Sequence, residues 1–398
     1  MILLIESSMR PLEDITVIAL EQAVAGPFCT RQLADMGARV IKIERPGIGD
    51  FARSYDERVR GLASYFVWVN RSKESLTLDI KHPAAAAILA RLLKKADVFL
   101  QNLAPGATAR LGLSYPALRE AYPRLIVCDV SGYGSDGPYR DKKAYDLLIQ
   151  SESGFLSITG TPEEPAKSGI SIADISAAMY AFSNILGALL ERQKTGSGCH
   201  VDISLLETMT EWMSYALYYG FDGASPPPRS GAAHATIYPY GPFPTADGKT
   251  VMLGLQNERE WEAFCSKVLE QPALAKDPRF SSNSRRVAAR EELKKIVVDA
   301  FSRFSAEQAV ERLDAAGIAN ARLKDVHEVW RHPQLKARWT TMETPVGPIP
   351  TLIPPGAPKA YLPRMDPLPA LGEHTDKILT ELGYDQNEII RLRRDNVV

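Results

Sequence analysis

Short apolar runs alternate with amphipathic stretches through the first 130 residues of the chain. Residues 82–96, HPAAAAILARLLKKA, have apolar positions at helical spacing and a proline in the first turn, which is typical of a helix. Residues 25–37 show a second such pattern. The intervening apolar runs lie at 15–20, 39–44, 75–80, 97–102 and 124–132. Strand and helix alternating at this interval predict βαβ units and a parallel, Rossmann-like sheet.

A long helical pattern and two proline-rich stretches follow. Small and apolar residues continue from Asp174 to about Lys194, where TGSG predicts the end of one long helix. Residues 222–244 and 345–369 are dense in proline and glycine, which is typical of extended segments. We expect both stretches to cross between domains.

The region between these crossings has strand and helix patterns of its own. A strand is expected over 247–255, and amphipathic helices over 257–269 and 289–304. These patterns indicate a second α/β domain. The expected division is a large Rossmann-like domain formed by 1–222 and 330–398, and a small α/β domain over 223–329.

Composition and charge favour a soluble globular protein. Hydrophobic residues make up 45% and charged residues 24%, and 47 Lys and Arg against 48 Asp and Glu leave a net charge of -1. This balance offers no basic excess for nucleic acid or an acidic membrane, and no run approaches the ~20 apolar residues of a membrane span. The four cysteines are widely spaced without a CxxC pair. We therefore expect free thiols, no metal site and a cytoplasmic location.

The nucleotide-binding signatures common on such sheets are missing. The first strand-to-helix turn reads ALEQAVAGPFCT (19–30) and lacks the GxGxxG that cradles a pyrophosphate. GxxxxGK[ST] and GxSxG are also absent from the sequence. A dinucleotide-dependent oxidoreductase, a phosphate-loop ATPase and an α/β-hydrolase are therefore disfavoured.

Asp174 is a carboxylate among small and apolar residues, in SGISIADISAAMYA (168–181). One interpretation is a helix cap, because the start of a helix offers free N–H groups and the positive end of its dipole. The other interpretation is a nucleophile toward an activated acyl group, because Ala173, Ser176 and Ala177 leave room for a ligand. The local sequence leaves both interpretations open.

A series of motifs spreads over nearly the whole chain. They are AGPFCTRQLADMGARVIKIERPGIGD (25–50), NRSKESLTLDIK (70–81), DVFLQNLAPGATARLGL (97–113), SGYGSDGPY (131–139), AYDLLIQSESGFLSITG (144–160), ERQKTGSGCHVDISLLE (191–207) and DPRFSSNSRRVAAREEL (277–293). Together they resemble family III CoA-transferases, a family that includes formyl-CoA and carnitine CoA-transferases and, as a side branch, α-methylacyl-CoA racemases. The resemblance implies chains that interlock as homodimers, and CoA as a substrate with no tightly bound cofactor.

The resemblance implies that Asp174 is the catalytic aspartate. Its carboxylate would attack an acyl-CoA thioester to give an acyl-aspartyl anhydride and the thiolate of CoA. The thiolate would return to form an aspartyl-CoA thioester and release the donor acid. An acceptor carboxylate would then reverse these steps and leave as the new acyl-CoA.

The resemblance also implies a set of CoA contacts. The set combines residues after the first strand, three basic side chains that can meet phosphates, and a leucine that can form an apolar wall for the adenine. Its members are Gln22, Ala23, Val24, Arg45, Leu78, Asn102, Arg110 and Lys143. Arg71 and Lys73 are further basic candidates without an assigned role.

Position 145 bears on the choice between transferase and racemase. Racemases of this family carry a His immediately before an Asp in the segment that matches KKAYDLL, and use that His with the helix carboxylate as a pair of bases. Here the position is Tyr145, followed by Asp146. A free phenol titrates near ~10 and is a poor base at neutral pH. The sequence therefore favours a transferase, with Tyr145 as a contact for CoA or substrate or as a packed aromatic.

Two stretches bear on the acid substrate. Formyl-CoA transferases carry a glycine run that closes over the reacting centre, and it is missing from PPPRSGAAHATIYPYGPF (226–243). Arg229, His234 and Tyr238 in this stretch could recognise a second carboxylate, although His234 is equally typical of a structural histidine. LGLQNEREW (253–261) resembles the branch that acts on short dicarboxylic acids. This implies transfer between succinyl-CoA and an acid such as itaconate; an intramolecular mesaconyl-CoA transferase is the alternative, and a racemase is less favoured.

Overall fold

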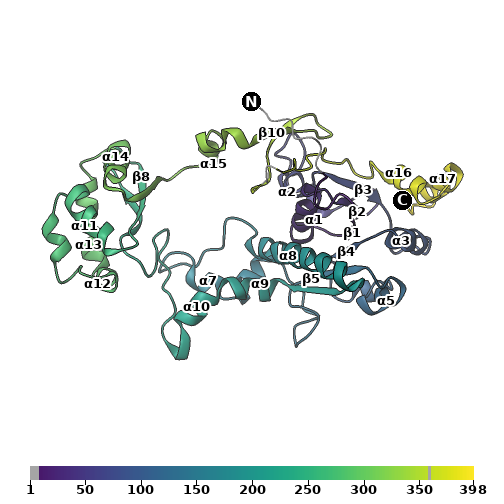
Figure 1. The fold of residues 1–398 in the computed structure, drawn as a ribbon, viewed down its shortest axis with the longest axis horizontal. Helices are drawn as coiled ribbons and strands as arrows, with labels where there is room; N and C mark the ends of the chain where they lie inside the picture. Colours follow the sequence, from purple (N-terminus) through teal and green to yellow (C-terminus); the bar gives the residue numbers. More distant parts are fainter. Residues whose placement is uncertain (1–8, 357–359) are drawn as a thin grey trace. The chain divides into compact units, whose positions relative to one another are not determined.

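The computed structural model describes residues 9–356 and 360–398, and the chain divides into two compact units (Figure 1). The large unit comprises Met1–Ser153, Gly169–Trp212 and Ala337–Val398. The small unit comprises Gly154–Ser168 and Met213–Lys336. Each unit has its own sheet and its own hydrophobic core.

The small unit was expected over 223–329, but its main segment is Met213–Lys336 and it also includes Gly154–Ser168. Hydrogen bonds between distant segments explain the added piece. The backbone N–H of Gly231 donates to the carbonyl of Gly160 at 2.7 Å, and Arg229 donates to the carbonyl of Thr161 at 2.8 Å. These bonds attach 154–168 to the proline-rich stretch. The segments before and after 154–168 both belong to the large unit.

The large unit is built on a six-stranded sheet with the order β3-β2-β1-β4-β5-β6, in which every neighbouring pair is parallel. Its strands are β1 Thr16–Leu20, β2 Arg39–Glu44, β3 Lys73–Thr77, β4 Val98–Gln101, β5 Ile126–Ser131 and β6 His200–Ser204. Its helices are α1 Ala25–Asp35, α2 Ser64–Val69, α3 Ala85–Leu93, α4 Ala107–Arg110, α5 Tyr115–Ala121, α6 Asp146–Glu152, α8 Ile172–Thr195, α9 Leu205–Trp212, α16 Thr375–Glu381 and α17 Gln386–Arg394. This architecture confirms the Rossmann-like α/β fold class.

Helices cover both faces of this sheet. Ile18 and Leu20 of β1 belong to the core cluster that also holds residues of α3, α16 and α17. Val17 and Ala19 alternate with them and so point to the other face, where α1 and α8 pack against each other and against the sheet. Figure 1 shows α8 (teal) running alongside β5.

Helix α8 is the predicted long helix, found at Ile172–Thr195. By length and composition it is apolar enough to cross a membrane. In this structure, however, its Ala177, Ala181 and Ile185 are fully buried against the rest of the large unit. Arg192 near its end donates to Asp97 at 2.9 Å. These contacts are those of a core helix.

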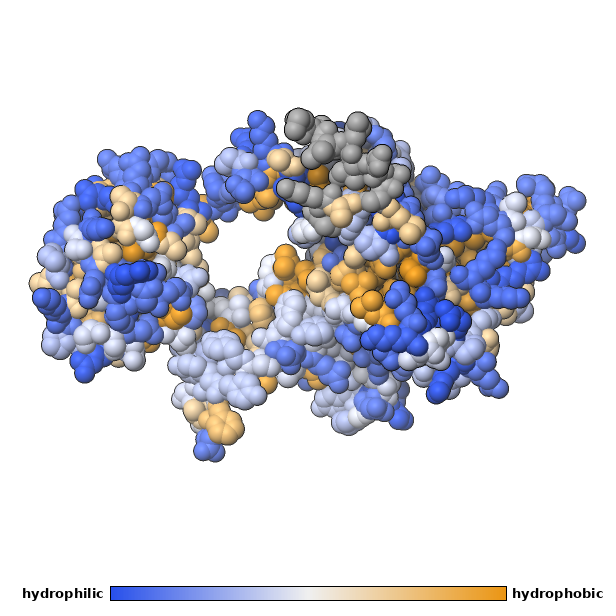
Figure 2. Space-filling model, viewed as in Figure 1, coloured by the Kyte–Doolittle hydropathy of each residue, from blue (hydrophilic) through white to orange (hydrophobic). Residues whose placement is uncertain are grey.

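The small unit has a three-stranded antiparallel sheet with the order β7-β8-β9. Its strands are β7 Tyr240–Pro244, β8 Thr250–Gly254 and β9 Ala319–Arg322. Its helices are α7 Phe155–Ile158, α10 Ser214–Tyr219, α11 Glu258–Ala263, α12 Asn283–Ala288, α13 Arg290–Phe301, α14 Ala306–Ala316 and α15 Val326–Trp330. Trp261, Phe264 and Phe301 fill its core, and Figure 2 shows a largely hydrophilic surface over α11–α14. A short antiparallel pair, β10 Trp339–Met342 and β11 Ile349–Leu352, belongs to the large unit.

The strand order places a crevice at one edge of the large sheet. From β1 the chain continues to β2 and β3 on one side, and from β4 it continues to β5 and β6 on the other side. The chain therefore leaves the carboxyl ends of the neighbouring strands β1 and β4 in opposite directions. Open α/β sheets bind their ligands at such a point. The loops that follow β1 and β4 therefore mark where a site is expected.

Candidate active site

Two cavities open at the carboxyl edge of the large sheet. The larger has a volume of about 670 Å³ and is lined by residues after β1, β4 and β5 and by the start of α8. The smaller, of about 30 Å³, lies beside β1 and β2. Gln22 and Leu103 line both, so the two cavities adjoin.

The larger cavity brings together most of the residues that the resemblance singled out. Those that line it are Gln22, Ala23, Val24, Asn102, Lys143, Tyr145 and Asp174. Arg45 and Leu78 line the smaller cavity instead. Arg110 lines neither cavity; it is exposed at the end of α4, in the segment that follows Asn102 and β4.

Asp174 lies in the first turn of α8, but another carboxylate caps that helix. The N–H groups of Ala173 and Asp174 donate to Oδ1 of Asp146, at 2.8 and 3.2 Å. Among the described residues, the carboxylate of Asp174 has neither a hydrogen-bond donor nor an ion-pair partner. The helix-cap interpretation of Asp174 is therefore wrong in this structure, because Asp146 performs that role.

The surroundings of Asp174 disfavour its ionised form. Burial, with the negative charge of Asp146 as a second cause, raises the pKa of Asp174 from 3.8 to about 7. Desolvation and a like charge both act against ionisation. A carboxylate with so elevated a pKa that opens onto a cavity is typical of a reactive group.

The loop after β1 is held to the loop after β4 by a pair of side chain–backbone bonds. The N–H of Gln22 donates to Oδ1 of Asn102 at 2.8 Å, and the amide of Asn102 donates to the carbonyl of Gln22 at 2.9 Å. Asn102 thus lines the cavity while its side chain fixes the cavity wall. Next in the chain, Ala23 adopts a left-handed backbone with φ of 61°.

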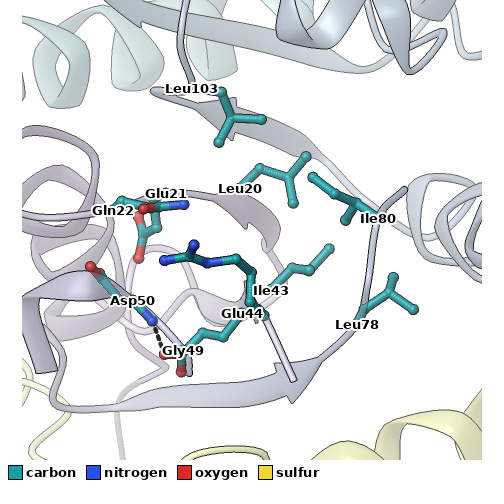
Figure 3. A pocket seen from close by; sticks show the side chains of 11 residues that line it. Leu20, Glu21, Gln22, Ile43, Glu44, Gly49, Asp50, Leu78, Ile80 and Leu103 are labelled. Carbon is teal, nitrogen blue, oxygen red and sulfur yellow. Dashed lines mark hydrogen bonds between the residues drawn. The ribbon is translucent and has the colours of Figure 1, made fainter. Parts of the chain in front are cut away.

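The smaller cavity has two contrasting sides (Figure 3). Leu20, Leu78, Ile80 and Leu103 form an apolar side, and Glu21 and Asp50 lie on the other. Leu78 lies on this apolar side, and its role as a wall for the adenine of CoA stays a prediction.

Unpaired basic side chains lie around the crevice. Within the parts of the chain that the structure describes, Arg45, Arg110 and Lys143 are exposed and form no ion pair. Arg71 and Lys73 are different, because Arg71 is buried against Asp35 at 2.8 Å and Lys73 against Glu21 at 2.6 Å. The first three residues are free to meet phosphate groups, whereas Arg71 and Lys73 are engaged inside the large unit and are withdrawn as phosphate candidates.

Aromatic side chains line the cavity near Asp174. Tyr145 is 70% exposed and directly precedes Asp146, the first residue of α6. Tyr55 and Tyr65 also line the cavity, with their rings edge to face at 5.7 Å. Burial, assisted by the nearby charges of Asp50 and Asp174, raises the pKa of Tyr55 to about 12. The Tyr55 hydroxyl therefore keeps its proton at neutral pH and can donate a hydrogen bond.

The three substrate candidates of the small unit are engaged in local contacts. Arg229 donates to the carbonyls of Thr161 and Pro162, both at 2.8 Å. Nδ1 of His234 accepts from two backbone N–H groups, those of Thr236 and Ile237, and burial, with the nearby Arg290 charge, lowers the pKa of this histidine. The Tyr238 side chain is a core residue, only 3% exposed. These contacts order the stretch, and a role of the three in substrate binding stays a prediction.

Sequence reasoning did not assign Asp146, Tyr55 or Tyr65 to the site. The position of Asp146 next to Tyr145 was a usable signal, because an acidic residue that begins one helix can reach the start of another. Tyr55 and Tyr65 lie outside the expected elements and carry no local signal. Only the packing of the large unit brings them to Asp174.

Comparisons with known proteins agree with this geometry. The family model described as CoA-transferase family III matches residues 12–375. Succinyl-CoA:glutarate CoA-transferase of Homo sapiens is 33% identical over 98% of this chain and 91% of its own length. Succinyl-CoA:mesaconate CoA-transferase of Haloarcula hispanica is 33% identical over 83% of this chain and 84% of its own length.

A solved structure agrees in the same way. The chain superposes on a CAIB/BAIF family protein from Brucella suis with a TM-score of 0.82 and 32% identity, over 94% of this chain and all of the other. The sheet, the crevice and the family match lead to one conclusion. The chain belongs to CoA-transferase family III and is a CoA-transferase.

Proposed function

We propose that this enzyme moves CoA from succinyl-CoA to a short dicarboxylic acid such as itaconate, with Asp174 as the nucleophile. One observation carries the proposal: the unpartnered carboxylate of Asp174 opens onto the 670 Å³ cavity. The names of the relatives support the substrate class, since succinyl-CoA is paired there with glutarate or mesaconate.

The first half-reaction begins with attack on the thioester. An oxygen of Asp174 bonds to the succinyl carbonyl carbon, the carbon–sulfur bond breaks, and the thiolate of CoA leaves. The products are a succinyl-aspartyl anhydride and the thiolate. The thiolate then attacks the Asp174 carbonyl carbon and expels succinate, which leaves an aspartyl-CoA thioester.

The second half-reaction runs the same steps with the acceptor. The acceptor carboxylate attacks the aspartyl thioester, forms a second anhydride and releases the thiolate. The thiolate attacks the acceptor's carbonyl carbon and restores the carboxylate of Asp174. One thioester is exchanged for another throughout, so the protein has mainly to position the reactants and exclude water.

The surrounding residues divide the work in this proposal. Arg45, Arg110 and Lys143 bind the phosphates of CoA. The first turn of α1 presents the positive end of its dipole to a cavity in which carboxylate and thiolate charges develop. Arg229, His234 or Tyr238 recognises a carboxylate of the acid in this proposal. The enzyme works as a cytoplasmic homodimer and needs no tightly bound cofactor.

The test follows oxygen from the acceptor. Itaconate labelled with ¹⁸O in its carboxylates is incubated with succinyl-CoA, and the peptide containing Asp174 is analysed by mass spectrometry. The mechanism leaves one acceptor oxygen on Asp174 and passes it to succinate in a later turnover. Direct attack of the acceptor on succinyl-CoA would label succinate and leave the peptide unlabelled.

Two variants complete the test. Asp174→Asn should abolish transfer while CoA still binds, and Asp136→Asn, at an exposed loop position, should keep full activity. Transfer by a clean Asp174→Asn protein would rule out the nucleophile. A panel of unlabelled acids identifies the fastest acceptor, and isomerisation of mesaconyl-CoA without exchange with free mesaconate would instead support the intramolecular alternative.

The racemase alternative is tested in D₂O. The enzyme is incubated with a 2-methylacyl-CoA, and deuterium at the α-carbon is measured. A transferase leaves this position unlabelled. Deuterium uptake without CoA exchange would mean that Tyr145 does not exclude racemisation.

A further inference from the structure

A network of buried ion pairs lies beneath the loop that follows β1. Glu21, Lys42, Asp50 and Lys73 are each at most 3% exposed. Two are acidic and two are basic, so their charges can balance. Figure 3 shows Glu21 and Asp50 beside the smaller cavity, and Lys42 does not line either cavity.

Lys42 is at the centre of this network. Its Nζ is 2.8 Å from Oδ2 of Asp50 and 3.4 Å from Oε1 of Glu21. Glu21 is held from the other side by Lys73, at 2.6 Å. Burial opposes the charge of Lys42, but the charges of Asp50, Glu21 and Glu44 outweigh it and hold the pKa of Lys42 above its ordinary value.

Asp50 connects the charges to the walls of the larger cavity. Its Oδ1 accepts from the N–H of Ala23 at 3.1 Å and from the N–H of Ala52 at 2.9 Å. Ala23 has the left-handed backbone that residues with a side chain rarely adopt. The same carboxylate therefore holds the strained loop after β1 and the start of the segment that carries Phe51 and Tyr55.

Both of these segments line the cavity that contains Asp174. Gln22, Ala23 and Val24 come from the first, and Phe51 and Tyr55 from the second. A buried ion pair is weak evidence for stability, because the loss of hydration offsets much of the attraction. The pair does, however, require defined distances and directions between its charged groups, so it can hold two backbone segments in fixed positions.

We propose that Lys42 is a positioning residue for acyl transfer: through Asp50 it fixes the backbone at 22–25 and 51–55, and so sets the reacting thioester against Asp174. The proposal rests on the proposed function, and it assigns Lys42 no contact with substrate. A displacement of about 1 Å at a reacting centre can lower a rate by roughly 100-fold. Loss of the Lys42 charge should therefore lower kcat much more than it weakens CoA binding.

The structure offers a matched control at the other end of α1. Arg31, Asp35 and Arg71 form a second buried ion cluster, with Arg31 at 2.7 Å and Arg71 at 2.8 Å from Asp35. None of the three lines either cavity. Arg71→Met removes a buried cation from a carboxylate, as Lys42→Met does, without touching the walls of the site.

The experiment compares Lys42→Met with Arg71→Met. With succinyl-CoA and the fastest acid acceptor, Lys42→Met should lower kcat by roughly 100-fold and leave the Kd for CoA, measured by calorimetry, within about threefold. Arg71→Met should lower Tm to a similar degree and keep kcat within about twofold. Equal losses of kcat in the two variants, or a loss in Lys42→Met confined to CoA binding, would overturn the proposal.

Two further measurements keep the proposal open to refutation. Should Lys42→Met fail to fold, Asp50→Asn replaces it. The amide oxygen of the new side chain can still accept from the N–H groups of Ala23 and Ala52, but the negative charge that pairs with Lys42 is gone. An unchanged kcat in this variant would overturn the proposal. Hydrogen exchange at the Ala23 and Ala52 amides needs no turnover, and it should quicken in Lys42→Met but not in Arg71→Met. Unchanged exchange refutes the positioning role, whereas a wild-type protein that transfers CoA to no acid refutes the proposed function instead.

Discussion

Replacing Asp174 by asparagine should stabilise the free enzyme, and the gain should depend on pH. The surroundings of the Asp174 carboxylate raise its pKa from 3.8 to about 7, mainly through burial and also through Asp146. One pKa unit corresponds to about 1.4 kcal/mol. Ionised Asp174 therefore lowers the free energy of unfolding by about 4 kcal/mol.

The sign of the pH dependence follows from the raised pKa. The folded protein binds the Asp174 proton more tightly than the unfolded chain does, so no penalty exists below about pH 4. The penalty grows as pH rises from about 4 to about 7, and it is complete above that range. Asparagine is neutral throughout, so the gain from Asp174→Asn should follow the same course.

Thermal unfolding of the large unit measures this gain. At about 2 °C per kcal/mol for a unit of this size, Asp174→Asn should raise Tm by roughly 8 °C at pH 8.5 and by little at pH 4.5. Asp136→Asn, at an exposed position, is the control and should show a flat difference. A Tm difference for Asp174→Asn that is constant with pH, or largest in acid, would refute the reasoning.

Three further predictions concern the site and its support. Asp146→Asn removes the like charge beside Asp174 and should lower the pKa of Asp174, so the acidic limb of the kcat profile should move to lower pH; an unmoved limb would contradict the assignment. Arg45→Ala should raise KM for every acyl-CoA by a similar factor, about 10-fold for one lost phosphate contact of ~1.4 kcal/mol, because it removes a contact to the part that all of them share. A hydrogen bond to Asp129, at 2.7 Å, raises the pKa of His200, so this stabilisation is full below about pH 6.5 and is lost as pH rises through the folded pKa. Asp129→Asn should therefore lower Tm more at pH 5.5 than at pH 9, and equal losses would argue against the pair.

The pattern of apolar residues predicted the strands of the large sheet closely, with one instructive error. The run at 39–44 is β2 residue for residue, and the other runs differ at their ends by one or two residues. β3 is the exception, because the run was expected at 75–80 and the strand is Lys73–Thr77, which starts two residues earlier and ends three residues earlier. Lys73 and Glu74 look like loop residues, but Lys73 is buried where Glu21 pairs with it. A charged residue takes a core strand position only when a distant partner is supplied.

The sequence by itself determined the βαβ alternation, the long helix at Asp174 and the family motifs, because spacing of apolar residues and runs of letters are local properties. The tertiary structure decided which carboxylate caps α8, since Asp146 reaches it from another helix. It also decided that Arg45 stays free while Lys42, Arg71 and Lys73 are buried in ion pairs. The environment of a charge is set by the groups that folding brings within a few ångströms, and those groups lie far away along the chain.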